Sequence, residues 1–112
     1  MTYYYEKDDL KKFNQGILGE DSPELWENFM KYYGSVFQDG ALTSREKSLI
    51  ALAVATVTGC PYCIEAYTKA CLQEGCEKAE LSEAMHTAAA LRAGALLAQA
   101  VPSKKLADKL SF

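Results

Sequence analysis

The stretch "LTSREKSLIALAVATVTGCPYCIEAYTKAC", residues 42–71, decides the fold because it carries the start and stop signals of two consecutive helices. Thr43 and Glu46 are spaced as a capping box, in which each side chain bonds the other residue's backbone N–H. A nearly unbroken apolar run then reaches Gly59, a residue type that commonly ends helices. Pro61 suits the first position of the next helix. The sequence therefore predicts two helices that follow each other directly.

Three further segments have helical spacing. "SPELWENFMKYYGSVFQDG" begins with Ser22 as a good N-cap and Pro23 at the first helical position, and Gly40 is expected to end this helix. A short helix is predicted in "DDLKKF", residues 8–13, and an Ala-rich helix over residues 79–100. Since no segment alternates as a strand does, the predicted fold class is all-α.

The chain is expected to form a single domain over residues 1–112, with residues 1–21 as an N-terminal arm. Its aromatic face at residues 25–37, the apolar run at residues 49–57 and the Ala-rich helix over residues 79–100 offer much apolar surface. A chain of 112 residues cannot readily hide all of it. The sequence therefore predicts a homo-oligomer.

Composition excludes several classes of function. Hydrophobic residues make up 49% and charged residues 24%, as in ordinary globular proteins. The net charge of -3, with dispersed basic residues, argues against a nucleic-acid partner. The longest apolar run is too short to cross a bilayer, and the start lacks the pattern of a signal peptide. We therefore expect a cytoplasmic protein without a membrane partner, in which four cysteines do not form a permanent disulfide framework.

The pair Cys60 and Cys63 falls at the predicted start of the second helix. Free backbone N–H groups and the positive end of the helix dipole favour a thiolate there. The three-residue offset also puts both sulfurs on one side of the helix, close enough to form a disulfide. Cys71, on the same stripe, is expected to be a small buried hydrophobe.

A four-thiolate metal site is the alternative use of the cysteines. Their pattern, C-x2-C-x7-C-x4-C, lacks the two short knuckles that structural zinc sites usually combine. The prediction is therefore that the chain holds no metal and no cofactor.

The combination of "REKSLIALAVA", "GCPYC" and a glycine about twelve residues later resembles the carboxymuconolactone decarboxylase family, especially its alkylhydroperoxidase D-like branch. More narrowly, "CPYCIEAYT" is similar to peroxidase-like proteins associated with arsenosugar biosynthesis. The resemblance implies an alkylhydroperoxidase D-like helical bundle, cofactor-free thiol chemistry and assembly into trimers or hexamers.

The resemblance also implies a proton relay that this chain has altered. The peroxidase branch carries a Glu and a His at the positions of Ser48 and Tyr67. Peroxide turnover is therefore expected to be slow, while disulfide exchange remains. Glu46 and His86 are candidates for a substitute base, and Tyr67 is a candidate hydrogen-bond donor to a thiolate or peroxide oxygen.

The leading hypothesis is a peroxidase-like, antioxidant thiol–disulfide oxidoreductase that takes a peroxide or disulfide substrate and is restored by a dithiol or protein reductant. Helix-start geometry favours Cys60 as the partner of the reductant, whereas the resemblance implies Cys63 as the site of peroxide attack, and the sequence leaves this division open. Two alternatives remain. One is a non-enzymatic protein that senses redox state or binds a soft metal or arsenic, and the other is a cofactor-free lactone decarboxylase.

Overall fold

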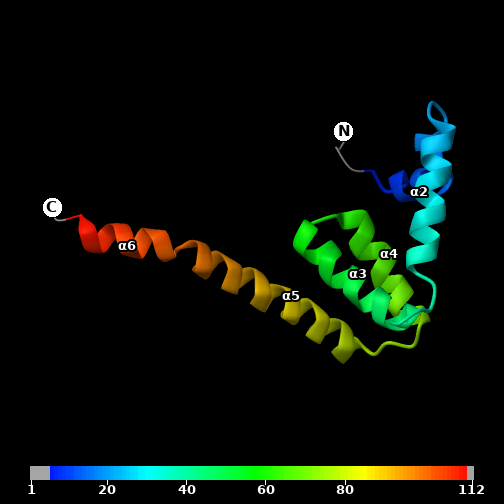
Figure 1. The fold of residues 1–112 in the computed structure, drawn as a ribbon. Coiled ribbons are helices and arrows are strands. Elements are labelled where there is room, and N and C mark those ends of the chain that lie inside the picture. The colour runs from blue at the N-terminus through cyan, green and yellow to red at the C-terminus, as the bar shows by residue number, and fades with distance from the viewer. Residues whose placement is uncertain (1–5, 111–112) are drawn as a thin grey trace.

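In the computed structural model, residues 6–110 are described, and the first five residues of the predicted N-terminal arm lie outside them. The elements in chain order are α1 (Asp9–Asn14), the short 3-10 helix η1 (Ile17–Gly19), α2 (Pro23–Val36), α3 (Ser44–Thr58), α4 (Pro61–Gln73), α5 (Lys78–Gln99) and α6 (Val101–Lys109) (Figure 1). No strand occurs in this described part of the chain. The predicted all-α fold is confirmed.

Local signals produce the pair of helices α3 and α4. At the start of α3, the hydroxyl of Thr43 accepts the N–H of Glu46 at 3.1 Å, and the Glu46 carboxylate accepts the N–H of Thr43 at 2.9 Å. At its end, Gly59 adopts φ of +72° and its N–H bonds the carbonyl of Ala55 at 2.9 Å. Glycine adopts this left-handed conformation without the steric cost that other residues meet. The chain thus turns directly from α3 into α4.

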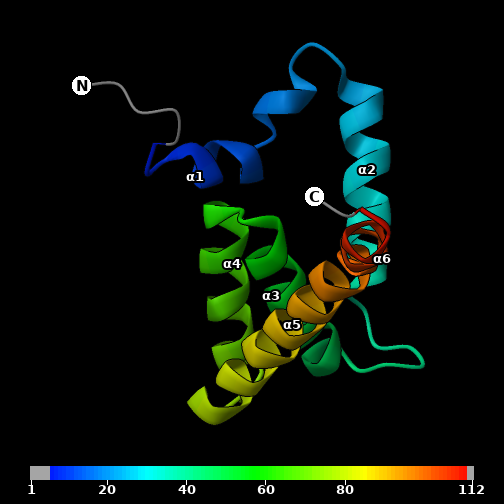
Figure 2. The same ribbon diagram turned by 90° about the vertical axis from the view of Figure 1, so that its left-hand side faces the viewer.

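The core lies where α3 packs against both α4 and α5 (Figure 2). Its buried side chains are Leu52, Cys71, Cys76 and Leu81, with Leu52 and Cys71 almost wholly enclosed. Arg45 on α3 forms a salt bridge with Glu80 in the first turn of α5. Helix α3 is therefore the central element of the core.

Helix α2 begins where the sequence predicts, with Ser22 as the N-cap residue and Pro23 as the first helical residue, but its end differs. It ends at Val36 rather than at Gly40. Ser22 is the N-cap, but its hydroxyl donates to the carbonyl of Leu18 at 3.1 Å instead of capping α2. Leu25, on the predicted apolar face, is 72% exposed. Only part of that face therefore packs inside this chain.

Aromatic rings join α2 to the elements on both sides of it. Successive ring centroids lie between 5.1 and 6.3 Å apart in a row that runs from α1 through α2 to α4. The row consists of Phe13, Trp26, Phe29, Tyr33, Phe37 and Tyr67. Because backbone contacts between α2 and α4 are sparse, these rings position α2 across from the start of α4.

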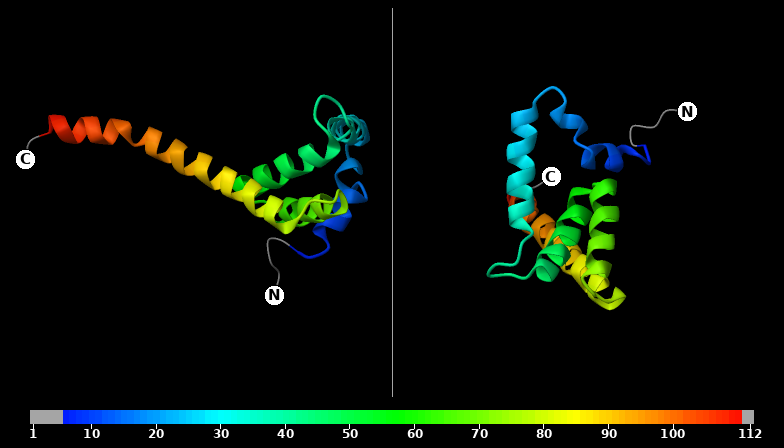
Figure 3. Two further views of the ribbon diagram at one scale, coloured as in Figure 1. Left: turned by 90° about the horizontal axis from the view of Figure 1, so that it is seen from below. Right: turned by 90° about the vertical axis from the view of Figure 1, so that its right-hand side faces the viewer.

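The second half of α5 and all of α6 extend away from the core as one long arm (Figures 1 and 3). Every residue from 89 to 110 is exposed. The radius of gyration is 19.2 Å, whereas a compact domain of this length has about 13 Å. The C-terminal arm, residues 89–110, therefore has no packing partner among the other described residues of its chain. No helix in the described range combines the length and the apolar character needed to span a bilayer.

Candidate active site

The two cysteines of the pair meet at the first turn of α4. Cys60 is the N-cap residue and Cys63 lies one turn into the helix. The sulfurs of Cys60 and Cys63 lie 2.7 Å apart and share a hydrogen bond, and the Cys60 sulfur also accepts the backbone N–H of Cys63 at 3.3 Å. Both side chains are half-buried. The structure thus brings the two sulfurs together at a helix start, where thiolates are stabilised.

The two thiols have opposite acidities. The pKa of Cys60 lies below that of an ordinary thiol, chiefly because of its hydrogen bond with the Cys63 side chain, with further help from backbone N–H groups. Burial raises the pKa of Cys63 to about 11, and the hydrogen bond with Cys60 adds to this effect. Cys60 is therefore the member of the pair that ionises first.

Two hollows give access to the pair. The first, named here the arm hollow, has a volume of about 540 Å³ and lies between α1, α2 and α4, with Leu10, Phe29 and Met30 among its walls. The second, the α3 hollow, has about 330 Å³ and is walled by apolar residues that include Ile50 and Val54. Cys60, Cys63, Tyr33 and Tyr67 line both. A substrate that reaches the sulfurs therefore meets mainly apolar walls.

The structure brings together the two positions at which the relay is altered. Ser48 is buried on α3, and Tyr67 lies on α4 one turn beyond Cys63. Both line a third hollow of about 360 Å³, which also reaches Tyr33. Tyr67 stacks on Phe37 with ring centroids 5.4 Å apart. Ser48 and Tyr67 thus share a hollow, but only Tyr67 also lines the two hollows that contain the cysteine pair, and neither supplies a base of ordinary strength at neutral pH.

The two candidates for a substitute base lie elsewhere. Glu46 is engaged in the capping box, where hydrogen bonds from the backbone and the hydroxyl of Thr43 hold the pKa of its carboxyl below the usual value. It occupies the first turn of α3, about 18 Å along the helix axis from the turn at Gly59. His86 is exposed on α5 and lines none of the three hollows in the described part of the chain. Neither reaches the pair within this chain.

The four cysteines do not converge. Cys71 and Cys76 are buried in the core, where desolvation and the neighbouring Cys76 raise the pKa of Cys71 to about 11. Among residues 6–110, the only set of three or more His, Cys, Asp or Glu ligand atoms close enough to share an ion is Glu6, Asp8 and Asp9. The four-thiolate arrangement is thus not assembled by this fold.

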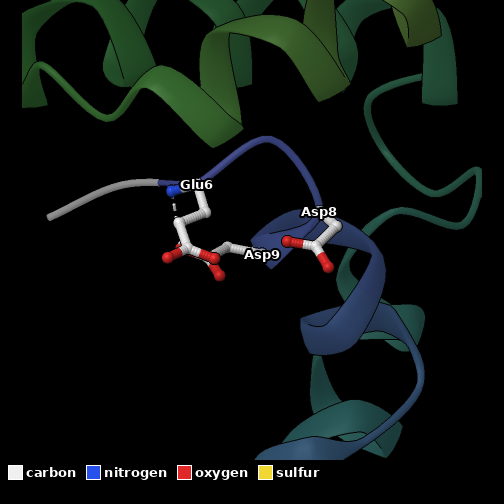
Figure 4. Close-up of side chains that lie close together, drawn as sticks. All are labelled: Glu6, Asp8 and Asp9. Carbon is white, nitrogen blue, oxygen red and sulfur yellow. Dashed lines mark hydrogen bonds between the residues drawn. The ribbon is translucent and has the colours of Figure 1, made fainter. Parts of the chain in front are cut away.

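Figure 4 shows these three acidic side chains at the start of the N-terminal arm. Glu6 and Asp8 are exposed. Asp9 is already engaged, because its carboxylate accepts the N–H of Glu6 at 3.0 Å and the hydroxyl of Tyr62 at 2.6 Å. We assign no ion to this cluster.

Two residues beside the pair, Tyr33 and Tyr62, were missed by sequence reasoning. Tyr62 lies between the two cysteines in the sequence. Its hydrogen bond to Asp9 connects α1, in the N-terminal arm, to the first turn of α4, although the two residues are 53 positions apart. Tyr33 faces the pair from α2. Neither contact leaves a local pattern, because both depend on how distant helices pack.

The bond between Tyr62 and Asp9 can be tested directly. Tyr62→Phe removes the hydroxyl and is expected to loosen α1 from α4, so that trypsin cleaves after Lys11 or Lys12 several times faster than in the wild type. Tyr32→Phe, at an exposed tyrosine of α2, is the matched control and should leave the cleavage rate unchanged. Equal cleavage rates for Tyr62→Phe and the wild type would contradict a tethering role.

Comparison with known proteins identifies the family. Residues 23–103 match the model of the carboxymuconolactone decarboxylase family. The chain belongs to this family. It is 42% identical over 96 residues to "Uncharacterized protein 4 in cox locus" of Paracoccus denitrificans, which covers 83% of this chain and 86% of that protein. An uncharacterised protein of Cupriavidus necator is 31% identical over 70 residues, 62% of each chain.

The fold of a carboxymuconolactone decarboxylase family protein is also found in a solved relative. A crystal structure of a protein from Methanobacterium thermoautotrophicum superposes with a TM-score of 0.71 at 35% identity, covering 74% of this chain and 93% of that one. The matched family segment begins at α2 and ends within α6, so it includes the whole α3–α4 pair. Membership links the chain to the alkylhydroperoxidase-like proteins at the level of the family.

Proposed function

We propose that this carboxymuconolactone decarboxylase family member is a peroxidase-like thiol–disulfide oxidoreductase of the reducing cytoplasm. In this proposal the Cys60 thiolate attacks and Cys63 resolves. The observation that carries it is the 2.7 Å separation of the two sulfurs, together with the backbone N–H of Cys63 that donates to the Cys60 sulfur at 3.3 Å. A donor directed at the Cys60 sulfur stabilises its charged form, which is the nucleophile in disulfide exchange.

The exchange proceeds in two balanced steps. The Cys60 thiolate attacks one sulfur of a substrate disulfide, which forms a mixed disulfide and expels the other substrate sulfur as a thiolate. Cys63 then gives its proton to that thiolate and attacks the Cys60 sulfur, which releases the second substrate sulfur. The pair ends as a disulfide, the substrate has gained two electrons, and a dithiol reductant restores the pair by the reverse route.

This assignment of roles differs from the one that family resemblance implies, in which Cys63 meets the substrate. A thiol with a pKa of about 11 is almost fully protonated at neutral pH and attacks slowly. Cys63 serves better as the hydrogen-bond donor that activates Cys60 and later resolves the mixed disulfide. The apolar walls of the two hollows also give little support to the alternative of a lactone decarboxylase, whose dicarboxylate substrate calls for polar partners.

The pH dependence of alkylation tests the activation of Cys60. In the reduced wild type, iodoacetamide should label Cys60 at a rate that rises with pH around a midpoint below that of an ordinary thiol, since only the thiolate reacts. Cys63→Ala removes the thiol donor and should move the midpoint upward. Cys63→Ser keeps an O–H donor and should lie between the two. Peptide mapping assigns the label, and a midpoint that Cys63→Ala leaves in place would contradict the proposal.

A pair of thiols at this spacing also suits a soft metalloid. Non-enzymatic arsenic binding is therefore the second candidate, favoured by the 2.7 Å separation of the two sulfurs. Mass spectrometry separates the two functions. An oxidoreductase reacts with a small disulfide and turns over with a dithiol, whereas a binding protein takes up one trivalent arsenic and shows no turnover.

A further inference from the structure

Tyr33 has a unique position relative to the pair. Of the residues of α2, all of which are described, it is the one that lines both the arm hollow and the α3 hollow. Its ring is held between Phe29 and Phe37, with centroids 5.6 and 5.2 Å away. The side chain is thus held in the wall that it shares with Cys60 and Cys63 in both hollows, whichever of the two a substrate enters.

The surroundings keep the Tyr33 hydroxyl protonated. Burial raises the pKa of Tyr33, and the charges of Cys63 and then Cys60 raise it further. The phenol therefore interacts electrostatically with both sulfurs and remains a proton donor at neutral pH. Tyr67 lines the same hollows, but it lies on α4 and stacks its face on Phe37.

We propose that Tyr33 donates the proton that the leaving oxygen takes up when the pair reduces a hydroperoxide. The phenol would thereby perform the step for which the resembled peroxidases carry a histidine at position 67. This inference rests on the proposed function, because it requires a reactive Cys60 thiolate and a resolving Cys63.

The step balances as follows. The Cys60 thiolate attacks the terminal oxygen of the hydroperoxide, so that an S–O bond forms, the O–O bond breaks and Cys60 becomes a sulfenic acid. The departing alkoxide takes the proton of Tyr33 and leaves as an alcohol. The phenolate then takes the proton of Cys63, whose thiolate attacks the Cys60 sulfur and expels hydroxide, which a solvent proton converts to water. A dithiol finally reduces the disulfide.

The acidities suit this sequence. An alkoxide is far more basic than a phenolate, so the proton moves readily from Tyr33 to the leaving oxygen. Cys63, with a pKa of about 11, exchanges its proton with a phenol of raised pKa at little cost. Disulfide exchange expels a thiolate instead, which leaves without an acid. Tyr33 should therefore matter much more for peroxides than for disulfides.

The experiment compares two reactions of the reduced full chain under single-turnover conditions. One is oxidation by tert-butyl hydroperoxide, and the other is reaction with a small aromatic disulfide. Tyr33→Phe keeps the ring contacts and should slow the peroxide reaction on the order of a hundredfold, so that the ratio of peroxide rate to disulfide rate falls at least about tenfold. Tyr32→Phe, at the exposed neighbour on α2, should change neither rate.

Each remaining outcome has a defined meaning. An unchanged ratio in Tyr33→Phe, or an equal fall of both rates, overturns the role of Tyr33. A fall of the ratio in Tyr67→Phe but not in Tyr33→Phe overturns it in favour of Tyr67. If the wild type reacts with neither probe, the proposed function itself fails. Circular dichroism of each variant, compared with the wild type, confirms that the helices are intact before the rates are compared.

Discussion

Cys60→Ser is expected to abolish reaction with both disulfides and peroxides, because it removes the proposed nucleophile, the sulfur of the pair whose pKa is lowered. Cys63→Ser should still react once and then stop, since the resolving thiol is missing. In that variant a small aromatic disulfide should leave a stable mixed disulfide on Cys60. Mass spectrometry of the intact chain, followed by peptide mapping, measures both results. Mild oxidation of the wild type should link Cys60 to Cys63 within one chain.

Cys71→Ser is the matched control for these variants. Cys71 is fully buried and its thiol is protonated, so its removal should leave the exchange reaction close to that of the wild type. A mixed disulfide trapped on Cys63 in the Cys60→Ser variant would show that the roles are reversed. A wild-type disulfide between Cys71 and Cys76 would refute the redox proposal altogether.

Light scattering of the wild type at micromolar concentration is expected to give the mass of several chains, each of 12.3 kDa, and not the mass of one. The isolated chain exposes 8971 Å², whereas a compact monomer of this mass exposes about 6100 Å². The excess, roughly 2900 Å² per chain, is of the size that obligate interfaces bury. We propose that partner chains cover the C-terminal arm and the outer face of α2, in a trimer or hexamer as the family resemblance implies.

A negative charge introduced on the C-terminal arm should break this assembly. Leu97 is 73% exposed in the isolated chain, and Leu97→Glu would place a carboxylate in the proposed interface. The variant should dissociate to smaller species, because an unpaired charge is costly to bury. Gln15→Glu adds the same charge at an exposed position outside both proposed interface surfaces and serves as the control. A wild-type mass of 12.3 kDa would contradict the assembly, whatever the variants do.

The fold of α3 and α4 was predictable because its signals are local. The capping box at Thr43, the left-handed Gly59 and the N-cap Cys60 each act within one or two turns of their own position. Gly75, with φ of +82°, likewise follows the end of α4. These signals also position the cysteine pair, so the centre of the candidate site follows from sequence.

The rest of the site depends on contacts between distant segments. Tyr33 reaches the pair only through the packing of α2 across from α4, and the bond from Tyr62 to Asp9 joins positions far apart in the chain. The early end of α2 at Val36 escaped prediction because apolar spacing continues through Phe37. Residues 89–110 form a helical arm without packing partners among the other described residues, and no pattern within one chain specifies its direction.

The turn at Gly59 bears on how this chemistry is recognised in other sequences. Gly59 is the single residue between the end of α3 and the N-cap Cys60, and its positive φ sets the direction in which α4 leaves. An added Cβ would meet no neighbour within 4 Å, so the restriction at this site comes from backbone conformation alone. Another residue here would favour a different turn and would move the Cys60 sulfur away from Cys63. A useful search pattern therefore contains five residues, Gly-Cys-x-x-Cys, and its glycine is as diagnostic as either cysteine.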